Sequence, residues 1–244
     1  MTDTRESTAT VLASGLVALA LPDATRIAET LMIFGRMLLE ANRSTNLVGT
    51  VDIDKLVVHH FLDSLAPLAM HRFRPPVIDL GSGAGLPGIP VAIAFPRAPI
   101  TLMEPRRLRA DFLRSAVAAL GLDRVEVVRT TAESAGRSET RRERAGTVMI
   151  RAIGKAEVAL ELGLPLLKRD GELWLYRGRD STPSQELLDI AALLGGTLAG
   201  SHRVTVPFLE AERHLWVFRK VAPTPEGYPR RSGVPERVPL QAGK

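Results

Sequence analysis

Val77-Ile-Asp-Leu-Gly-Ser-Gly-Ala-Gly-Leu-Pro-Gly88 is the most informative segment of this chain. Its first four residues are mostly apolar and β-prone, which predicts a buried strand, and glycines follow at positions 81, 83 and 85. The apolar run 89–95 then predicts a helix. A strand, a glycine-rich turn and a helix open the nucleotide-binding unit of α/β proteins, because glycine lets the backbone approach a ligand and adopt a positive φ.

The spacing of the glycines fits two ligands. Gly83, Gly85 and Gly88 match G-x-G-x-x-G, the dinucleotide fingerprint, and would make the chain a nicotinamide-dependent oxidoreductase. Gly81, Gly83 and Gly85 match G-x-G-x-G after a strand that carries Asp79, the form associated with S-adenosylmethionine enzymes. We favour the second interpretation because Gly81 falls where the strand should end, although spacing alone leaves both open.

Beyond residue 76 the sequence alternates between strand and helix patterns, which predicts an α/β fold with a parallel sheet covered on both faces. The last two expected strands, 204–206 and 214–220, are close enough to form a hairpin. We therefore predict a seven-stranded, mainly parallel sheet. The other expected strands span 77–80, 100–104, 125–128, 147–150 and 172–176, and the expected helices span 106–120, 156–167 and 183–194.

The remaining chain divides into two flanking parts. Residues 1–75 show helical periodicity without a clear strand, so we expect a helical extension packed on a core domain at 76–221. This extension should contain a polar break at 42–46 and a helix at 53–68. His59 and His60 lie in that helix, and adjacent residues cannot face the same way, so we expect no metal site there. The basic, proline-rich tail 222–244 should have little regular structure.

Composition limits the possible functions. The chain has 244 residues, a net charge of +5 and a pI near 10.1, which favours a polyanionic partner. It has no cysteine, which excludes disulfides and thiol catalysis and agrees with a cytoplasmic location. The apolar run 11–21 is too short to span a bilayer, so we expect no membrane association. Nothing in the sequence suggests a coiled coil, and we expect a monomer.

Six motifs together resemble a known family, the small-subunit ribosomal RNA guanine-N7 methyltransferases, also called glucose-inhibited division protein B. The resemblance runs from about residue 30 to the tail, and one departure is Ile150, where many relatives have serine. The motifs are Asn46-Leu-Val-Gly, His60-Phe-Leu-Asp-Ser64, Ile78-Asp-Leu-Gly-Ser-Gly-Ala-Gly-Leu-Pro-Gly-Ile-Pro90, Ile150-Arg-Ala152, Glu212-Arg-His-Leu215 and Tyr228-Pro-Arg230.

This resemblance implies a Rossmann-like, class I S-adenosylmethionine-dependent methyltransferase fold. The implied reaction is methylation of N7 of a guanine in the decoding-region loop of 16S ribosomal RNA. By resemblance, Gly81, Gly83 and Leu86 line the cofactor pocket, and Glu104, after the second strand, holds the ribose. Ala132 and Glu133 would lie beside the adenine.

Further residues have less definite roles. Arg151 would pair with the cofactor carboxylate or steady the RNA, and its role would be orientation or charge stabilisation. His60 and Asp63 lie in the helical extension and either approach the site or fix helix packing.

The chemistry of the implied reaction agrees with what the sequence lacks. Guanine N7 has an in-plane lone pair and no proton, so methylation needs alignment and no general base. The Asn/Asp-Pro-Pro-aromatic motif common in amino-group methyltransferases is missing, since residues 150–154 read Ile-Arg-Ala-Ile-Gly. The absence of cysteine excludes the nucleophilic route to cytosine C5. A third hypothesis is a non-catalytic RNA-binding assembly factor that keeps the cofactor as a structural ligand.

Several arginines are candidates for contacts with RNA. Aromatic residues make up only 5% of the chain, which argues against a platform that stacks single-stranded bases, so we expect a folded RNA in an assembled or partly assembled small subunit. We expect the tail to add salt-dependent RNA affinity without affecting cofactor affinity. The candidates are Arg106, Arg107 and Arg109 at a helix start, Arg177 and Arg179 after the fifth strand, and Arg230, Arg231 and Arg237 in the tail.

Overall fold

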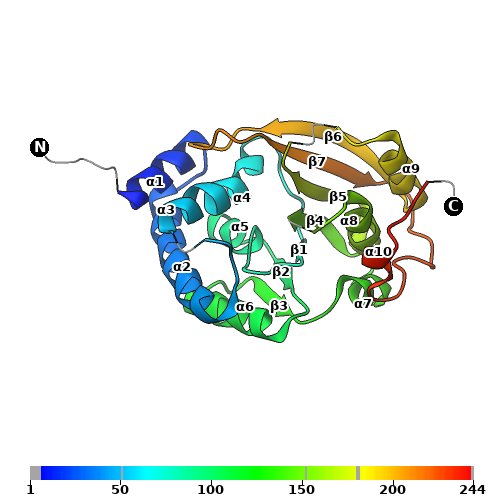
Figure 1. Cartoon of the computed structure of the whole chain (residues 1–244), viewed down its shortest axis with the longest axis horizontal. Coiled ribbons are helices and arrows are strands. Elements are labelled where there is room, and N and C mark those ends of the chain that lie inside the picture. Colours follow the sequence, from blue (N-terminus) through cyan, green and yellow to red (C-terminus); the bar gives the residue numbers. More distant parts are fainter. Residues whose placement is uncertain (1–6, 51, 152, 180–181, 243–244) are drawn as a thin grey trace, which may run out of the picture.

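A computed structural model describes residues 7–50, 52–151, 153–179 and 182–242. Seven strands form one sheet in the order β3-β2-β1-β4-β5-β7-β6, and β7 alone runs against the others in the described part of the chain. This confirms the predicted seven-stranded, mainly parallel sheet with a closing hairpin (Figure 1). The strands are β1 (Val77–Leu80), β2 (Ile100–Met103), β3 (Val125–Val128), β4 (Ala145–Arg151), β5 (Leu167–Arg177), β6 (Gly196–Val204) and β7 (Arg213–Lys220).

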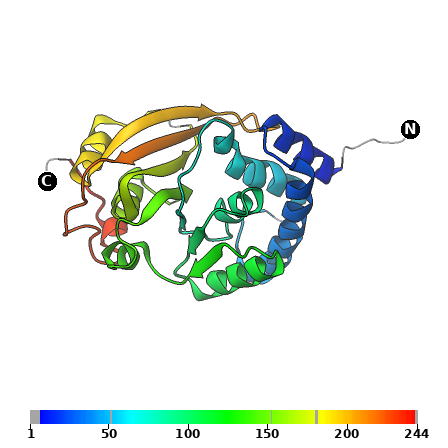
Figure 2. The same cartoon turned by 180° about the vertical axis from the view of Figure 1, so that it is seen from behind.

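Helices cover both faces of the sheet, and alternate strand residues belong to different cores. Val77 belongs to the core formed with the helices that precede β3, whereas its neighbour Ile78 belongs to the core formed with the later helices. Figure 2 shows the sheet between these two groups from behind. The first group includes α5 (Gly88–Ala94) and α6 (Arg107–Ala119), and the second comprises α7 (Ala132–Arg137), α8 (Ala156–Gly163), α9 (Gln185–Leu193) and α10 (Val234–Arg237).

The N-terminal residues form helices that pack on α5 and α6, with Leu16, Phe34 and Phe61 fully buried in the shared core. α1 (Thr8–Ala18) and α2 (Ala24–Thr45) lie far from the C-terminal α10 (Figures 1 and 2). The next helix is continuous but changes type along its length, through α3 (Ile53–Leu56), a π-helical turn at Val57–Leu62, α4 (Asp63–Leu65) and a 3-10 turn at Ala66–Ala69. No helix in the described ranges is long and apolar enough to cross a membrane.

Two local predictions were wrong. The polar residues from Asn42 continue α2 to Thr45 instead of breaking it, because Asn42 Oδ1 accepts bonds from Leu47 N and Val48 N (2.6 and 2.9 Å) and folds the following loop back. β6 ends at Val204, where the first closing strand was expected to begin.

The tail was predicted to have little regular structure, and its described residues agree, since only Val234–Arg237 is helical; the tail is nevertheless held on the core. Its backbone is fixed on the core by Arg142, which donates to the carbonyls of Thr224 and Tyr228 (2.6 and 2.7 Å), and by Arg137, which donates to that of Pro229 (2.8 Å). It then forms the short helix α10. The division of the chain near residues 75 and 221 remains a prediction. Residues 1–6, 51, 152, 180–181 and 243–244 lie outside the described ranges.

Candidate functional site at the carboxyl edge of the sheet

The strand order reverses between β1 and β4, whose carboxyl ends carry Gly81 and Arg151. Ligands of open α/β sheets bind in the crevice outside such a switch point. The glycine turn leaves β1 there with positive φ at Gly81, Gly83 and Gly85 (74°, 55° and 87°). A side chain at these three positions would strain the backbone, so the turn requires glycine where the sequence has it.

Gly88 has a different role, because it lets α5 pack against the sheet. A Cβ atom at this position would lie 2.3 Å from Leu102 Cδ2 and 2.6 Å from Asp79 Oδ2. Both glycine patterns proposed from the sequence are therefore structurally required. The geometry of the turn alone does not distinguish a dinucleotide from S-adenosylmethionine.

Two buried carboxylates hold the turn. Asp79 accepts a bond from Gly88 N (3.0 Å), and burial raises its pKa to about 7. Glu104 accepts bonds from Gly83 N and Arg106 N (2.9 and 2.8 Å) and is only 3% exposed. Glu104 thus links the end of β2 to the loop that follows β1.

A cavity of about 440 Å³ lies beside this turn, and we call it the donor cavity because the resemblance implies that a methyl donor binds at this turn. Four of the predicted cofactor residues line it, namely Gly81, Glu104, Ala132 and Glu133. Gly83, Leu86 and Arg151 are not among its lining residues. The other walls come from the ends of β1, β2 and β3, from α6 and α8, from the loop after β4 and from the tail. They comprise Leu80, Met103, Pro105, Arg106, Arg109, Thr130, Thr131, Ile153, Gly154, Leu162, Ser232, Gly233 and Glu236.

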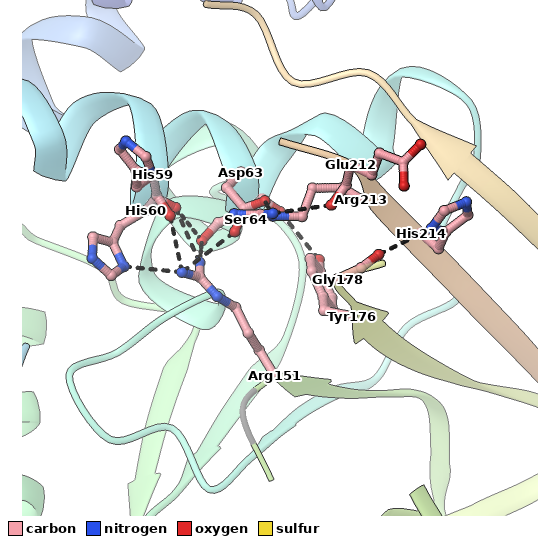
Figure 3. Close-up of polar contacts among 10 residues, drawn as sticks. All are labelled: His59, His60, Asp63, Ser64, Arg151, Tyr176, Gly178, Glu212, Arg213 and His214. Atoms are coloured by element: carbon pink, nitrogen blue, oxygen red, sulfur yellow. Dashed lines mark hydrogen bonds and ion pairs between the residues drawn. The ribbon is translucent and has the colours of Figure 1, made fainter. Parts of the chain in front are cut away.

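Arg151 instead joins β4 to the N-terminal helices (Figure 3). Its guanidinium donates to the carbonyls of His59 and His60 (3.1 and 3.2 Å), to His60 Nδ1 (2.9 Å) and to Ser64 Oγ (2.8 Å). It also lies 3.4 Å from Asp63 Oδ2. Sequence reasoning left the roles of His60 and Asp63 open, and the structure brings both to Arg151.

The cluster around Arg151 lowers the pKa of His60 to about 4, mainly by burial and then through the positive charges of Arg151 and His59. His60 is therefore neutral at neutral pH, and its Nδ1 can accept the bond from Arg151. The π-helical turn at Val57–Leu62 supplies the two carbonyls that Arg151 binds, and such turns occur often at functional sites.

A second, larger cavity of about 670 Å³ opens at this cluster, and we call it the basic cavity. Its lining has four cationic side chains, Lys55, Arg151, Arg177 and Arg213, and one carboxylate, Asp63. Three histidines add further polar groups, and no group of three or more His, Cys, Asp or Glu side chains that could hold a metal occurs in the described residues.

Sequence reasoning gave no role to Lys55, Tyr176, Arg213 or His214. Arg213 donates to Asp63 Oδ1 (2.8 Å) and the Tyr176 hydroxyl donates to the Ser64 carbonyl (3.1 Å), as Figure 3 shows. His214 Nδ1 lies 3.0 Å from the Gly178 carbonyl. Arg213 and His214 belong to the sequence motif Glu212-Arg-His-Leu215, and this motif could have indicated that they lie at the site. Nothing in the sequence distinguished Lys55 and Tyr176.

The arginines predicted to bind RNA do not form one surface. Arg106 and Arg109 line the donor cavity, while Arg177 lines the basic cavity with its guanidinium over the Trp216 ring (4.9 Å). Arg107, Arg179 and Arg231 are exposed. Two tail arginines bind within the protein instead, since Arg230 pairs with Glu161 (2.7 Å) and Arg237 donates to the Gly233 carbonyl (3.0 Å).

The topology and the site define a class of protein. A seven-stranded sheet of this order with an antiparallel β7, a glycine turn after β1 and an acidic residue after β2 is the arrangement of the Rossmann-like, class I S-adenosylmethionine-dependent methyltransferases. The family model described as "GidB: rRNA small subunit methyltransferase G" matches residues 27–216, and the chain belongs to this family.

Two sequence relatives agree with the family model. A ribosomal RNA small subunit methyltransferase G from Desulforamulus reducens is 34% identical over 207 residues, which cover 84% of this chain and 86% of the relative. One from Trichormus variabilis is 36% identical over 212 residues, with the same two coverages. A solved structure of a mutant 16S rRNA (adenine(1408)-N(1))-methyltransferase from Catenulisporales acidiphilia covers 61% of this chain and 86% of its own, at 21% identity and a TM-score of 0.49.

The family decides between the ligands that the glycine spacing left open. This chain is a methyltransferase that uses S-adenosylmethionine as its methyl donor, and the nicotinamide-dependent alternative was wrong. The resemblance identified from the six motifs is confirmed.

Proposed function

We propose that this protein transfers a methyl group from S-adenosylmethionine to N7 of a guanine in the decoding-region loop of 16S ribosomal RNA. The name of the family supports the small-subunit RNA as substrate. The resemblance described above supports the base and the atom. We further expect a monomer that acts in the cytoplasm on an assembled or partly assembled small subunit.

The donor cavity suits the methyl donor. Its volume of about 440 Å³ lies within the roughly 300–1,000 Å³ typical of small-molecule sites. Backbone without side chains at the turn allows close approach, and the buried Glu104 carboxylate can accept hydrogen bonds from ribose hydroxyls with lone pairs that its two backbone bonds leave free. When bound, S-adenosylmethionine supplies a methyl group that is already electrophilic.

The basic cavity suits the RNA. Lys55, Arg177 and Arg213 give it positive charge that attracts phosphates, and its volume of about 670 Å³ exceeds what one base requires. Guanine N7 carries a lone pair and no proton, so none of the lining residues has to act as a general base. Arg151 is a positioning residue in this proposal, because it holds the π-helical turn that forms one wall.

A single observation carries the proposal, namely that a smaller cavity at the carboxyl edge of the sheet shares lining residues with both the donor cavity and the basic cavity. This smaller cavity of about 240 Å³ shares Ile153 and Gly154 with the donor cavity. It shares Tyr176, Arg177 and Gly178 with the basic cavity. A nucleotide that enters beside the cationic side chains can therefore extend its base toward the methyl donor.

The test is methyl transfer from labelled S-adenosylmethionine to small subunits that lack the modification. Wild-type protein should label the 16S RNA, and Gly81→Val should abolish labelling because valine is strained at a φ of 74° and its Cβ would lie 3.1 Å from Ile153 Cδ1. Gly227→Val is the matched control, since nothing lies within 4 Å of a Cβ atom there. Assembly of small subunits that depends on the protein, without any labelling of 16S RNA by it, would contradict the proposed reaction.

A further inference from the structure

The C-terminal segment 228–240, which we call the strap, forms part of the donor cavity. Ser232, Gly233 and Glu236 line this cavity together with Gly81 and Glu104. The strap runs past α7 and α8 and includes α10, as both views of the molecule show (Figures 1 and 2). It lies outside residues 27–216, the part of the chain that the family model matches.

The strap is anchored at its start by a buried ion pair. Glu161 on α8 is fully buried, and its Oε1 accepts bonds from Arg230 N and Nε (2.8 and 2.9 Å). Its Oε2 accepts a further bond from Arg230 Nη2 (2.7 Å). A buried carboxylate needs such a partner, so the fold of α8 and the position of the strap depend on each other.

Close packing fixes the same end of the strap against α7. A Cβ atom at Gly136 would lie 2.8 Å from Pro229 Cγ, so a larger residue in α7 would displace the strap. Arg137 also donates to the Pro229 carbonyl (2.8 Å). These contacts leave the next residues, 231–233, beside the donor cavity.

At the cavity itself the strap binds a predicted cofactor residue. Gly233 N donates to Glu133 Oε1 (2.8 Å), and Gly233 has the positive φ of 75° that favours glycine. Ser232 Oγ lies 3.2 Å from Thr131 Oγ1. The strap therefore orients Glu133 and closes the side of the cavity formed by residues 130–133.

We propose that the strap is a wall of the cofactor site and that Arg230 is the positioning residue that seats it. When Arg230 holds the strap in place, the strap keeps S-adenosylmethionine in the cavity and delays release of the cofactor. This inference rests on the proposed location of the donor. It replaces the prediction that the tail contributes to RNA affinity alone, because Arg230 is bound to Glu161 and the strap touches the donor cavity.

The experiment compares S-adenosylmethionine affinity by calorimetry, without RNA, in wild-type protein and Arg230→Met. We expect Kd to rise at least tenfold in the variant, and hydrogen exchange of residues 228–240 to become faster. Arg144→Met is the control, since Arg144 is exposed and lines none of the three cavities at the carboxyl edge of the sheet, and it should change neither quantity.

A second variant separates the seating of the strap from general instability. Arg230→Met leaves Glu161 buried without its partner, and the double variant Glu161→Gln/Arg230→Met removes that unpaired charge. The double variant should regain stability and still bind S-adenosylmethionine weakly. Arg230→Lys keeps one ion pair and should rescue the affinity in part.

The outcomes distinguish this inference from the proposed function. Glu104→Ala should also weaken cofactor binding if the donor occupies this cavity, and an unchanged affinity in that variant would overturn the location itself. If Glu104→Ala weakens binding while the folded double variant binds S-adenosylmethionine like the wild type, the strap does not hold the cofactor. Neither readout depends on whether RNA is methylated.

Discussion

Arg151 Nη1 lies 2.8 Å from Ser64 Oγ, although the two residues are 87 positions apart in the sequence. This contact, with those to the carbonyls of His59 and His60, ties the end of β4 to the N-terminal helices. It places the basic cavity on one side of β4 while the donor cavity lies toward β1 and β2. The helical extension is thus part of the candidate site.

Replacing Arg151 tests whether it positions the helices or binds the donor. Arg151→Met leaves two carbonyls and Asp63 with fewer partners, and we expect the free energy of unfolding to fall by about 2–4 kcal/mol. Methylation should drop with it, whereas S-adenosylmethionine affinity should change less than threefold because Arg151 does not line the donor cavity. Urea unfolding and calorimetry measure the two effects. A tenfold loss of cofactor affinity in the folded variant would show that Arg151 contacts the donor.

Gly88→Ala tests the packing of α5 on the sheet. A Cβ atom there would lie 2.3 Å from Leu102 Cδ2 and 2.9 Å from Asp79 Cβ, so these side chains must shift. Overpacking of this kind costs about 1–3 kcal/mol, which urea unfolding resolves. Gly227→Ala has open space around the new methyl group and should change stability by less than about 0.5 kcal/mol. Equal effects of the two substitutions would argue against the close contact at Gly88.

The lowered pKa of His60 makes the free energy of unfolding depend on pH. Its pKa is about 4 in the folded protein and 6.5 in the unfolded chain, so between these values the unfolded chain binds a proton that the folded protein does not. Stability therefore falls as the pH drops through this window and is unaffected above it. Between pH 7 and pH 5, wild type should lose roughly 1–2 kcal/mol more than His60→Asn, after allowance for solvent screening.

The comparison with His60→Asn is needed because Asp79 has the opposite effect on the pH dependence of stability. Its pKa is raised from 3.8 to about 7, so the folded protein retains a proton that the unfolded chain loses, and stability falls as the pH rises through that range. Asparagine at position 60 keeps an acceptor for Arg151 but does not titrate. An identical pH dependence of wild type and His60→Asn, measured by urea unfolding, would refute the assignment of a buried neutral histidine.

Lys55 tests the contact between the basic cavity and RNA. Its side chain is exposed and lines this cavity, so Lys55→Ala should weaken binding of the small-subunit RNA without altering S-adenosylmethionine affinity. The slope of log K against log salt should decrease by roughly 0.7–0.9 if one phosphate contact is lost. Arg97→Ala is the control, because Arg97 is exposed before β2 at the opposite edge of the sheet. Equal slopes for Lys55→Ala and wild type would place the RNA elsewhere.

The sequence alone was sufficient to predict the elements that are determined by neighbouring residues. β1 was predicted with its exact bounds because a strand buried on both faces of a parallel sheet is a short apolar run, and the glycines after it fix the turn. β6 was misplaced because it lies at the sheet edge and mixes exposed and buried residues, so its pattern is weak. Glu104 was predicted to follow the second strand, and the structure places its carboxylate at the turn after β1.

The contacts that complete the site are not local, and this explains what was missed. Arg151 forms its hydrogen bonds with residues 59–64, and Arg230 forms its ion pair with Glu161, which is 69 positions away in the sequence. The tail was predicted to have little regular structure because proline and charge dominate its composition, and its position on the core is fixed by partners on α7 and α8. No periodicity within the tail predicts those partners.

The most direct test of the central claim is to identify the methylated atom. Purified protein, S-adenosylmethionine and small subunits without the modification are incubated, and the methylated nucleotide of the 16S RNA is then mapped by chemical cleavage and mass spectrometry. We predict a single 7-methylguanine in the decoding-region loop that is absent when Gly81→Val replaces the wild type. Methylation of another base or another atom, or no methylation by folded protein that binds the donor, would contradict the proposal.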